Sequence, residues 1–189
     1  ARSNGHTLVP TKPALVPLEV YESWVKELQG LSLKNIAIEI VDEEQNIIYE
    51  DFGEMLFTHF GVSGPIILSG SSCIDDLDKN KYTLIIDLKP ALSMEQLDRR
   101  VQRDFNKYSR KIFSNSLDDL LPKKLISVIV ELSNIHSQKV VNQITKEERQ
   151  GLVTLLKRLK LSIKSFRPID EAIVTSGGVS VKEIDPKTM

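Results

Sequence analysis

This sequence contains a single cysteine and almost no net charge, and each shortage argues against a class of protein. With Cys73 alone the chain can form no internal disulfide, and no cysteine–histidine group has the spacing of metal ligands. A formal net charge of −1 argues against a surface built as a whole to attract nucleic acid or anionic membrane. No apolar run approaches the ~20 residues that span a bilayer, and the N-terminal residues do not resemble a signal peptide. We therefore expect a cytoplasmic protein without a metal site.

Common nucleotide-binding and catalytic motifs are also missing. No Gly-x-Gly-x-x-Gly follows a strand, so the chain has no sequence basis for holding a dinucleotide pyrophosphate by itself. The Walker A sequence, the nucleophile elbow and the His-Glu-x-x-His zinc motif are absent as well. What remains is the composition of an ordinary globular protein, with 41% hydrophobic and 27% charged residues. Its 189 residues suit one or two domains.

The two ends of the chain are predicted to be rich in β-structure. Within residues 33–41, Ile36, Ile38 and Ile40 alternate with polar residues, which indicates a half-buried strand. A polar turn at 42–46 separates it from the second arm of a hairpin. The expected strands span residues 33–41, 47–52, 82–88, 169–175 and 179–184, the last two joined by a glycine turn at 176–178.

The middle of the chain is predicted to be helical. Two capping boxes, Ser93 with Gln96 and Thr145 with Glu148, mark the starts of two helices, and Pro122 begins a third. The first helix is expected to end near residue 108, and residues 116–121 suggest a further helical turn. Their apolar residues recur at three- and four-residue steps, as in an amphipathic helix. The first and last helices carry Met94, Leu97, Val101, Phe105 and Tyr108, and Leu152, Leu155, Leu156 and Leu159, respectively.

These patterns predict an α+β fold, in which an antiparallel β-barrel-like domain is interrupted by a small helical bundle. Too few helices lie between the strands for a parallel sheet. The β-domain is expected to span residues 1–92 and 164–189, and the helical subdomain residues 93–163. The missing initiator Met and the abrupt end at residue 189 would fit a segment cut from a larger protein, or a trimmed one.

The most informative stretch runs from residue 53 to residue 70. Its polar and turn-forming residues are, in order, Thr58, His59, Gly61, Ser63, Gly64 and Pro65. Ser63 is placed to cap the start of a helix that has Pro65 in its first turn. Such a corner would direct free backbone N–H groups and the His59 ring at one point, where a ligand could bind. The alternative is a tight turn with a buried, hydrogen-bonded His59.

Basic residues concentrate on the first helix, over residues 93–111. One interpretation is a face that binds RNA or phosphate, and the other is an ordinary solvated surface of mixed charge. Three acidic residues are interspersed, which favours the second. The basic residues are Arg99, Arg100, Arg103, Lys107, Arg110 and Lys111, and the acidic ones Glu95, Asp98 and Asp104.

Three segments, taken in order and with their separations, resemble a known family. They are residues 5–7 (Gly-His-Thr) with 13–18 (Pro-Ala-Leu-Val-Pro-Leu), residues 53–65 (Gly-Glu-Met-Leu-Phe-Thr-His-Phe-Gly-Val-Ser-Gly-Pro), and residues 175–179 (Thr-Ser-Gly-Gly-Val) with 183–189 (Glu-Ile-Asp-Pro-Lys-Thr-Met). Together they resemble the BaiN/aminoacetone-oxidase-like family of bacterial flavoproteins, which are NAD(P)/FAD-dependent oxidoreductases.

In that family a long insertion splits an FAD-binding Rossmann domain. The insertion is a β-barrel-like substrate domain that carries a helical subdomain. The resemblance implies that this chain is the insertion alone, and that FAD binds the full-length parent and not this fragment. The fragment by itself would be inactive. Its partners would be the Rossmann domain of the same parent chain and a small-molecule substrate. No membrane partner is expected, and the near-zero net charge argues against nucleic acid as a partner.

The resemblance also assigns site residues. His59 would polarise or protonate the substrate as the catalytic residue. Gly177 and Gly178 would lie where the chain returns to the FAD domain. The residues that face the flavin and the substrate would be Thr58, Phe60, Gly61, Ser63 and Gly64 beside His59.

Two other hypotheses stay open at this point. The chain could be a free-standing module that binds RNA or a protein partner through the basic helix of residues 93–111. The helical bundle could also mediate formation of a homodimer.

Overall fold

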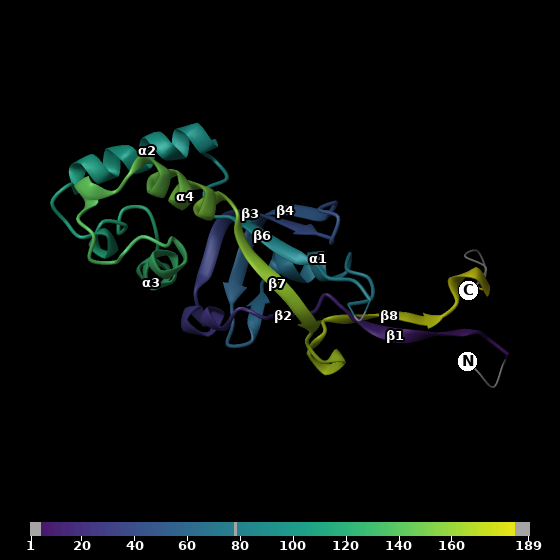
Figure 1. Cartoon of the computed structure of the whole chain (residues 1–189). Helices are drawn as coiled ribbons and strands as arrows, with labels where there is room; N and C mark the ends of the chain where they lie inside the picture. The colour runs from purple at the N-terminus through teal and green to yellow at the C-terminus, as the bar shows by residue number, and fades with distance from the viewer. Residues whose placement is uncertain (1–4, 78, 184–189) are drawn as a thin grey trace.

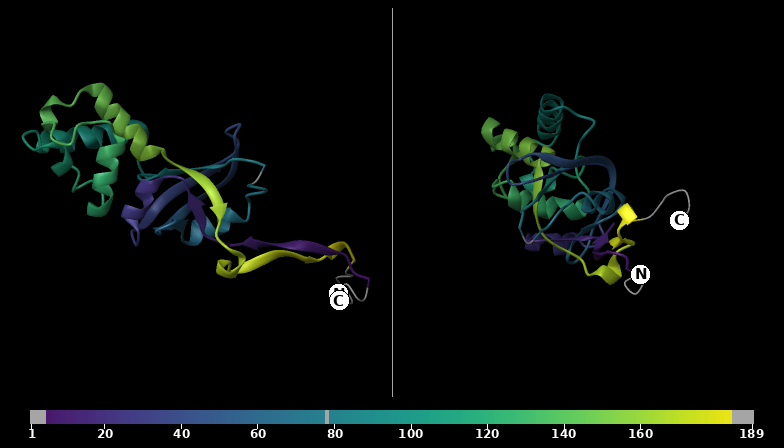
Figure 2. Two further views of the ribbon diagram at one scale, coloured as in Figure 1. Left: turned by 60° about the horizontal axis from the view of Figure 1, so that its bottom comes forward. Right: turned by 90° about the vertical axis from the view of Figure 1, so that its right-hand side faces the viewer.

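The computed structural model describes residues 5–77 and 79–183. A group of helices, a β-barrel and a two-stranded ribbon follow one another along an elongated molecule (Figure 1). A second view keeps the helices and the ribbon at opposite ends of the barrel (Figure 2). No helix of the described ranges is long and apolar enough to cross a bilayer.

The barrel consists of six strands in the closed order β2-β5-β4-β3-β6-β7. Every pair of neighbouring strands in it is antiparallel, which confirms the predicted barrel-like fold. The strands are β2 (Leu18–Val20), β3 (Ser32–Val41), β4 (Ile47–Phe57), β5 (Gly61–Ser63), β6 (Thr83–Asp87) and β7 (Leu159–Phe166).

The hairpin of β3 and β4 forms the largest part of the barrel wall. Ile36, Ile38 and Ile40 are each at most 2% exposed, so the alternation in the sequence does mark the face that points to the core. The core continues without a break from the barrel into the helical part.

Within the described ranges, four α-helices and several short 3-10 helices complete the fold. Both predicted capping boxes are present, because Ser93 and Thr145 each accept a hydrogen bond from the backbone of the third helical residue. The α-helices are α1 (Pro65–Ser71), α2 (Met94–Lys107), α3 (Lys123–Leu132) and α4 (Lys146–Lys157). The 3-10 helices are η2 (Ser23–Leu28), η3 (Phe113–Asn115), η4 (Val141–Gln143), η5 (Ile169–Glu171) and η6 (Val181–Glu183).

The end of the helical part differs from the prediction. Helix α4 ends at Lys157 and β7 begins at Leu159, so residues 159–163 belong to a barrel strand rather than to the helical stripe. Met94, expected on the apolar stripe of α2, is 42% exposed. Lys157 anchors this junction, since its Nζ donates to the carbonyls of Lys89 and Leu92.

The predicted glycine turn at residues 176–178 is wrong. These residues lie inside one continuous strand, β8 (Val174–Val179), which pairs antiparallel with β1 (Leu8–Ala14) to form the ribbon. The partner strand lies far away in the sequence, so no local pattern could indicate the pairing. The flanking segments expected as strands instead contain η5 and η6, and residue 184 lies outside the described residues.

Candidate functional site

The residues at the end of β4 form a tight turn into β5. The N–H of Thr58 donates to the carbonyl of Gly61 at 2.9 Å, and the N–H of Gly61 donates to Thr58 Oγ1 at 3.1 Å. The Thr58 hydroxyl is therefore engaged within the turn, while His59 and Phe60 occupy its tip.

Two glycines let this corner pack closely on the barrel. A Cβ on Gly61 would lie only 2.1 Å from the carbonyl oxygen of Leu18 in β2. Gly64 has a φ of +101°, and a Cβ there would lie 3.0 Å from backbone atoms of β4. Such a backbone conformation is accessible to glycine and strained for other residues. The two glycines thus set the shape of the corner.

Ser63 does not cap α1 as predicted. Gly64 is the N-cap residue and the helix starts at Pro65, whereas Ser63 is paired with Leu56 in the β4–β5 ladder. The N-cap preference for serine misplaced the start of the helix by one residue. Ser63 is still in the β4–β5 ladder, and the chain turns into the helix at Gly64, where φ is positive.

His59 is exposed and lies at a cavity of about 450 Å³ on the side of the barrel. The interpretation of His59 as a buried side chain is therefore wrong. The cavity is bounded by β2, the start of η2 and the end of β7. Its polar lining includes Glu19, Glu22, Lys26, His59, Lys164 and Arg167, with Tyr21 and Phe60 as aromatic walls.

An ionic cluster centred on Arg167 organises one wall of this cavity. Arg167 Nη1 donates to Glu19 Oε1 at 2.7 Å, and its Nε donates to Glu171 Oε2 at 3.0 Å. Lys164 Nζ lies 3.7 Å from Glu19 Oε2. The hydrogen bonds from Arg167 lower the pKa of Glu19 and of Glu171, and raise the pKa of Arg167 itself. Both carboxylates are therefore ionised at neutral pH.

The same arginine links the cluster to the tip of the turn. Its guanidinium carbon lies 4.4 Å from the centre of the Phe60 ring, a cation–π geometry. The Phe60 ring meets the His59 imidazole edge to face, with 5.0 Å between ring centres and an interplanar angle of 78°. The pKa of Glu171 is lowered mainly by Arg167 and, among smaller effects, by His59. An exposed imidazole thus stands beside a wall of fixed charges, in a position to meet a ligand.

The predicted glycines Gly177 and Gly178 do not line this cavity. They lie in β8 of the ribbon, which extends away from the barrel (Figure 1). A second cavity of about 470 Å³ lies at the base of the ribbon, with Ser176 and Lys12 among its lining residues and with Arg167 shared between the two cavities.

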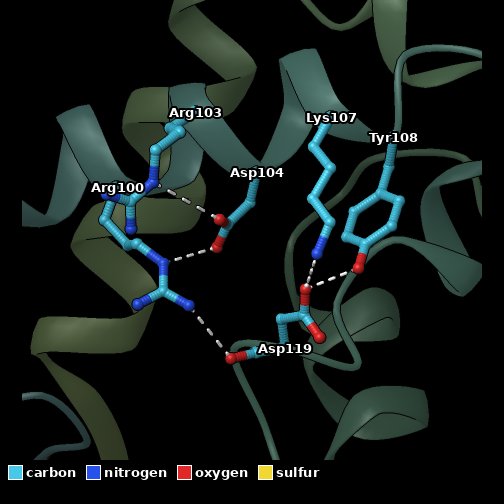
Figure 3. Close-up of polar contacts among 6 residues, drawn as sticks. All are labelled: Arg100, Arg103, Asp104, Lys107, Tyr108 and Asp119. Carbon is cyan, nitrogen blue, oxygen red and sulfur yellow. Dashed lines mark hydrogen bonds and ion pairs between the residues drawn. The ribbon is translucent and has the colours of Figure 1, made fainter.

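Two of the six basic residues between positions 93 and 111, Arg100 and Lys107, make contacts inside the helical part. Arg100 Nε lies 2.7 Å from Asp104 Oδ2, and Lys107 Nζ and Tyr108 Oη both donate to the Asp119 carboxylate (Figure 3). Arg100 also donates to the backbone carbonyl of Asp119. These contacts attach the segment before α3 to α2. The exposed basic residues of this face outside the Asp119 cluster are Arg99, Arg103, Arg110 and Lys111.

Comparison with known proteins decides the family. A model described as the HI0933-like protein barrel and H2TH domain matches residues 12–174. The chain belongs to this family. The match confirms the resemblance drawn from the sequence motifs. Residues 5–7 of the first motif and the whole third motif, from residue 175 onward, lie outside the matched range.

Three curated proteins align with the whole chain. It is 28% identical to a 3-dehydro-bile acid delta(4,6)-reductase of Clostridium scindens, and the alignment covers 46% of that protein. It is 27% identical to ribosomal RNA dihydrouridine synthases of Escherichia coli and Haemophilus influenzae, each covered over 44% of its length. The chain thus spans less than half the length of these relatives.

Within this HI0933-like domain, sequence reasoning found the corner but missed its surroundings. The sequence patterns did not single out Glu19, Arg167 or Glu171 as site residues. The four-residue spacing of Arg167 and Glu171 was a weak signal for their ion pair. Glu19 had no such signal, because it reaches Arg167 only across the β2–β7 pairing.

Proposed function

We propose that this chain forms the substrate-side wall, or lid, over the flavin of an FAD-dependent oxidoreductase. The observation that carries the proposal is the exposed His59–Phe60 tip beside a cavity of about 450 Å³. Family membership supports it. So do the relatives, one named a reductase and two named for making dihydrouridine, a nucleoside with two more hydrogens than uridine.

The described residues of this chain do not fit FAD by themselves. The barrel pairings are all antiparallel, so the parallel βαβ unit that holds a dinucleotide pyrophosphate is absent from the described ranges. In this proposal the cofactor is held by another part of the parent protein, and this chain faces it.

His59 would then act on the substrate as a proton donor or hydrogen-bond donor. A reduction of a double bond consumes a proton, and an exposed imidazole at a cavity is suited to deliver it. Phe60 would contact the substrate with the part of its ring that Arg167 does not cover. Thr58, Gly61, Ser63 and Gly64 would act by holding the tip in place.

The ribbon would attach this domain to the part that binds FAD. A two-stranded ribbon is only marginally stable by itself in water, and this one exposes Val9 and Val174, with the exposed Ile173 directly before β8. Packing of Gly177 and Gly178 against the cofactor-binding part would cover this surface.

The test uses the full-length protein. It should purify with a bound flavin spectrum, and His59→Ala should lower turnover on a 3-dehydro-bile acid or on uridine in ribosomal RNA, by about 10²- to 10⁴-fold. His136→Ala is the matched control, since His136 is also exposed but lies in the helical part. A colourless protein to which added FAD does not bind would end the proposal. Unchanged turnover in His59→Ala would remove His59 from the chemistry.

A second candidate function is RNA binding through the basic segment of residues 93–111, which comprises α2 and the turn that follows it. The observation that favours it is the set of exposed cations Arg99, Arg110 and Lys111, together with the two relatives named for ribosomal RNA. Replacing all three by glutamine should weaken RNA binding and reduce the slope of log affinity against log salt by up to about three. Lys160→Gln, an exposed lysine of β7, is the control. Failure to retard RNA even at low salt would exclude this candidate.

A further inference from the structure

A small cavity of about 260 Å³ lies at the junction between the barrel and the helical part. The start of β3, the exit of β6 and the segment that leads into α3 form its walls, and it shares no lining residue with the His59 cavity. Its only charged lining residues among the described ranges are Lys34 and Lys89. The other walls are mostly apolar, from Leu33, Ile36, Leu88, Leu121 and Leu125.

Lys89 carries its charge in an unfavourable place. The residue is half-buried, and within the described ranges its ammonium group makes no ion pair with a carboxylate. Burial lowers the pKa of Lys89, and the nearby guanidinium of Arg100 lowers it further. A cation that is partly desolvated and repelled by a second cation destabilises the protein unless something negative binds beside it.

The surroundings of the cavity supply little compensation. Arg100 is paired with Asp104, so that carboxylate is already engaged. Lys34 is exposed and, among the described residues, has no acidic partner. Two carboxylates lie nearby. The Ser32 hydroxyl donates to Glu54 Oε1 at 2.5 Å. Asp87, which is already paired with Lys157, accepts the backbone N–H of Lys89 at 2.8 Å. The junction therefore has an excess of positive charge inside a partly apolar pocket.

We propose that this cavity binds a single phosphate group, carried either by a free phosphorylated small molecule or by an RNA backbone. Lysine ammonium groups bind phosphate through charge-assisted hydrogen bonds, and the apolar walls strengthen the attraction by excluding water. The volume is below the range of roughly 300–1,000 Å³ of ligand pockets, so it suits one small anion rather than a larger molecule. A bound phosphate would offset the repulsion between Lys89 and Arg100. The site does not depend on the oxidoreductase role of the His59 cavity.

Calorimetric titration of the full-length protein with inorganic phosphate, at constant ionic strength in chloride buffer, tests the proposal. Lys89→Gln should bind phosphate about tenfold more weakly, as expected for the loss of a charge-assisted hydrogen bond, and Lys34→Gln should weaken binding in the same direction. Lys160→Gln should leave the affinity unchanged. A thermal unfolding curve checks folding, and Lys89→Gln should melt no lower than the wild type without phosphate, because the substitution removes a repulsion.

A short oligoribonucleotide in the same titration separates the two sources. If inorganic phosphate binds in a Lys89-dependent way, the site takes a free phosphate group. If only the oligoribonucleotide does so, the phosphate comes from a backbone. Equal affinities of the wild type and Lys89→Gln for both probes, or no binding of either, would overturn the proposal.

Discussion

The guanidinium of Arg167 covers one face of the Phe60 ring, with 4.4 Å between the guanidinium carbon and the ring centre. Arg167 is held from the other side by Glu19 and Glu171. Arg167, directly after β7, therefore packs against the β4–β5 turn that carries His59, although the two segments are far apart in the sequence. The contact connects the ionic cluster to the proposed catalytic residue.

Arg167→Lys should disturb this corner, because lysine cannot keep both the bidentate contact with Glu171 and the stacking on Phe60. We expect a lower melting temperature and a loss of turnover in the full-length protein, without loss of bound flavin. Arg158→Gln is the control, since Arg158 is exposed and lies 3.6 Å from Glu39 on another part of the barrel. Equal turnover of Arg167→Lys and the wild type would show that the stacking has no role in placing His59.

Gly64→Ala should destabilise the protein by about 1–3 kcal/mol, because alanine is strained at a φ of +101° and its Cβ would press on β4. Gly151→Ala is the matched control. Gly151 lies in α4 with open space around its missing Cβ, so this change should stabilise by about 0.5–1 kcal/mol. Urea denaturation measures the free energy of unfolding of both variants. If both substitutions changed it in the same direction, the proposed strain at Gly64 would be contradicted.

Acid should weaken the contact between Glu19 and Arg167. The folded pKa of Glu19 lies below its ordinary value of 4.5, so the contact stabilises the fold above about pH 4.5 and this contribution is lost as the pH falls through the folded pKa. Glu19→Gln should therefore have a lower free energy of unfolding than the wild type at neutral pH. Between about pH 5 and pH 3 its free energy of unfolding should fall less steeply than that of the wild type. Urea unfolding at several pH values measures this, and parallel curves for the two proteins would refute it.

Removal of a helix cap should cost about 1 kcal/mol at Ser93. Ser93→Ala leaves the backbone N–H of Gln96 without its partner at the start of α2. Ser127→Ala, at an exposed position inside α3, should be neutral or slightly stabilising because alanine favours helix interiors. The measurement is thermal or urea unfolding of the two variants. A cost at Ser127 as large as that at Ser93 would argue against the cap.

Local patterns predicted the secondary structure well where each element is specified by its own residues. The alternation of Ile36, Ile38 and Ile40 placed β3, and the two capping boxes placed the starts of α2 and α4. The prediction failed where pairing with a strand distant in the sequence overrode the local pattern. Leu159 continued the helical spacing yet lies in β7, because β6 offers that segment a pairing edge.

The candidate site was predictable only in part, for the same reason. The turn-forming residues between positions 58 and 64 are recognisable in the sequence, so the corner could be located and His59 singled out. Its neighbours Glu19 and Arg167 come from β2 and β7, whose adjacency depends on closure of the barrel.

The sequence by itself determined many of the local elements and the family. Helix caps, strand alternation and the motif of residues 53–65 are each specified by residues close together in the chain. Only the tertiary structure decided which elements meet. The three-residue strands β2 and β5 carry too little pattern to predict pairing, and they acquire their place from hydrogen bonds to β4 and β7. The ribbon, the Arg167 cluster and the Lys89 cavity all follow from those long-range pairings and packings.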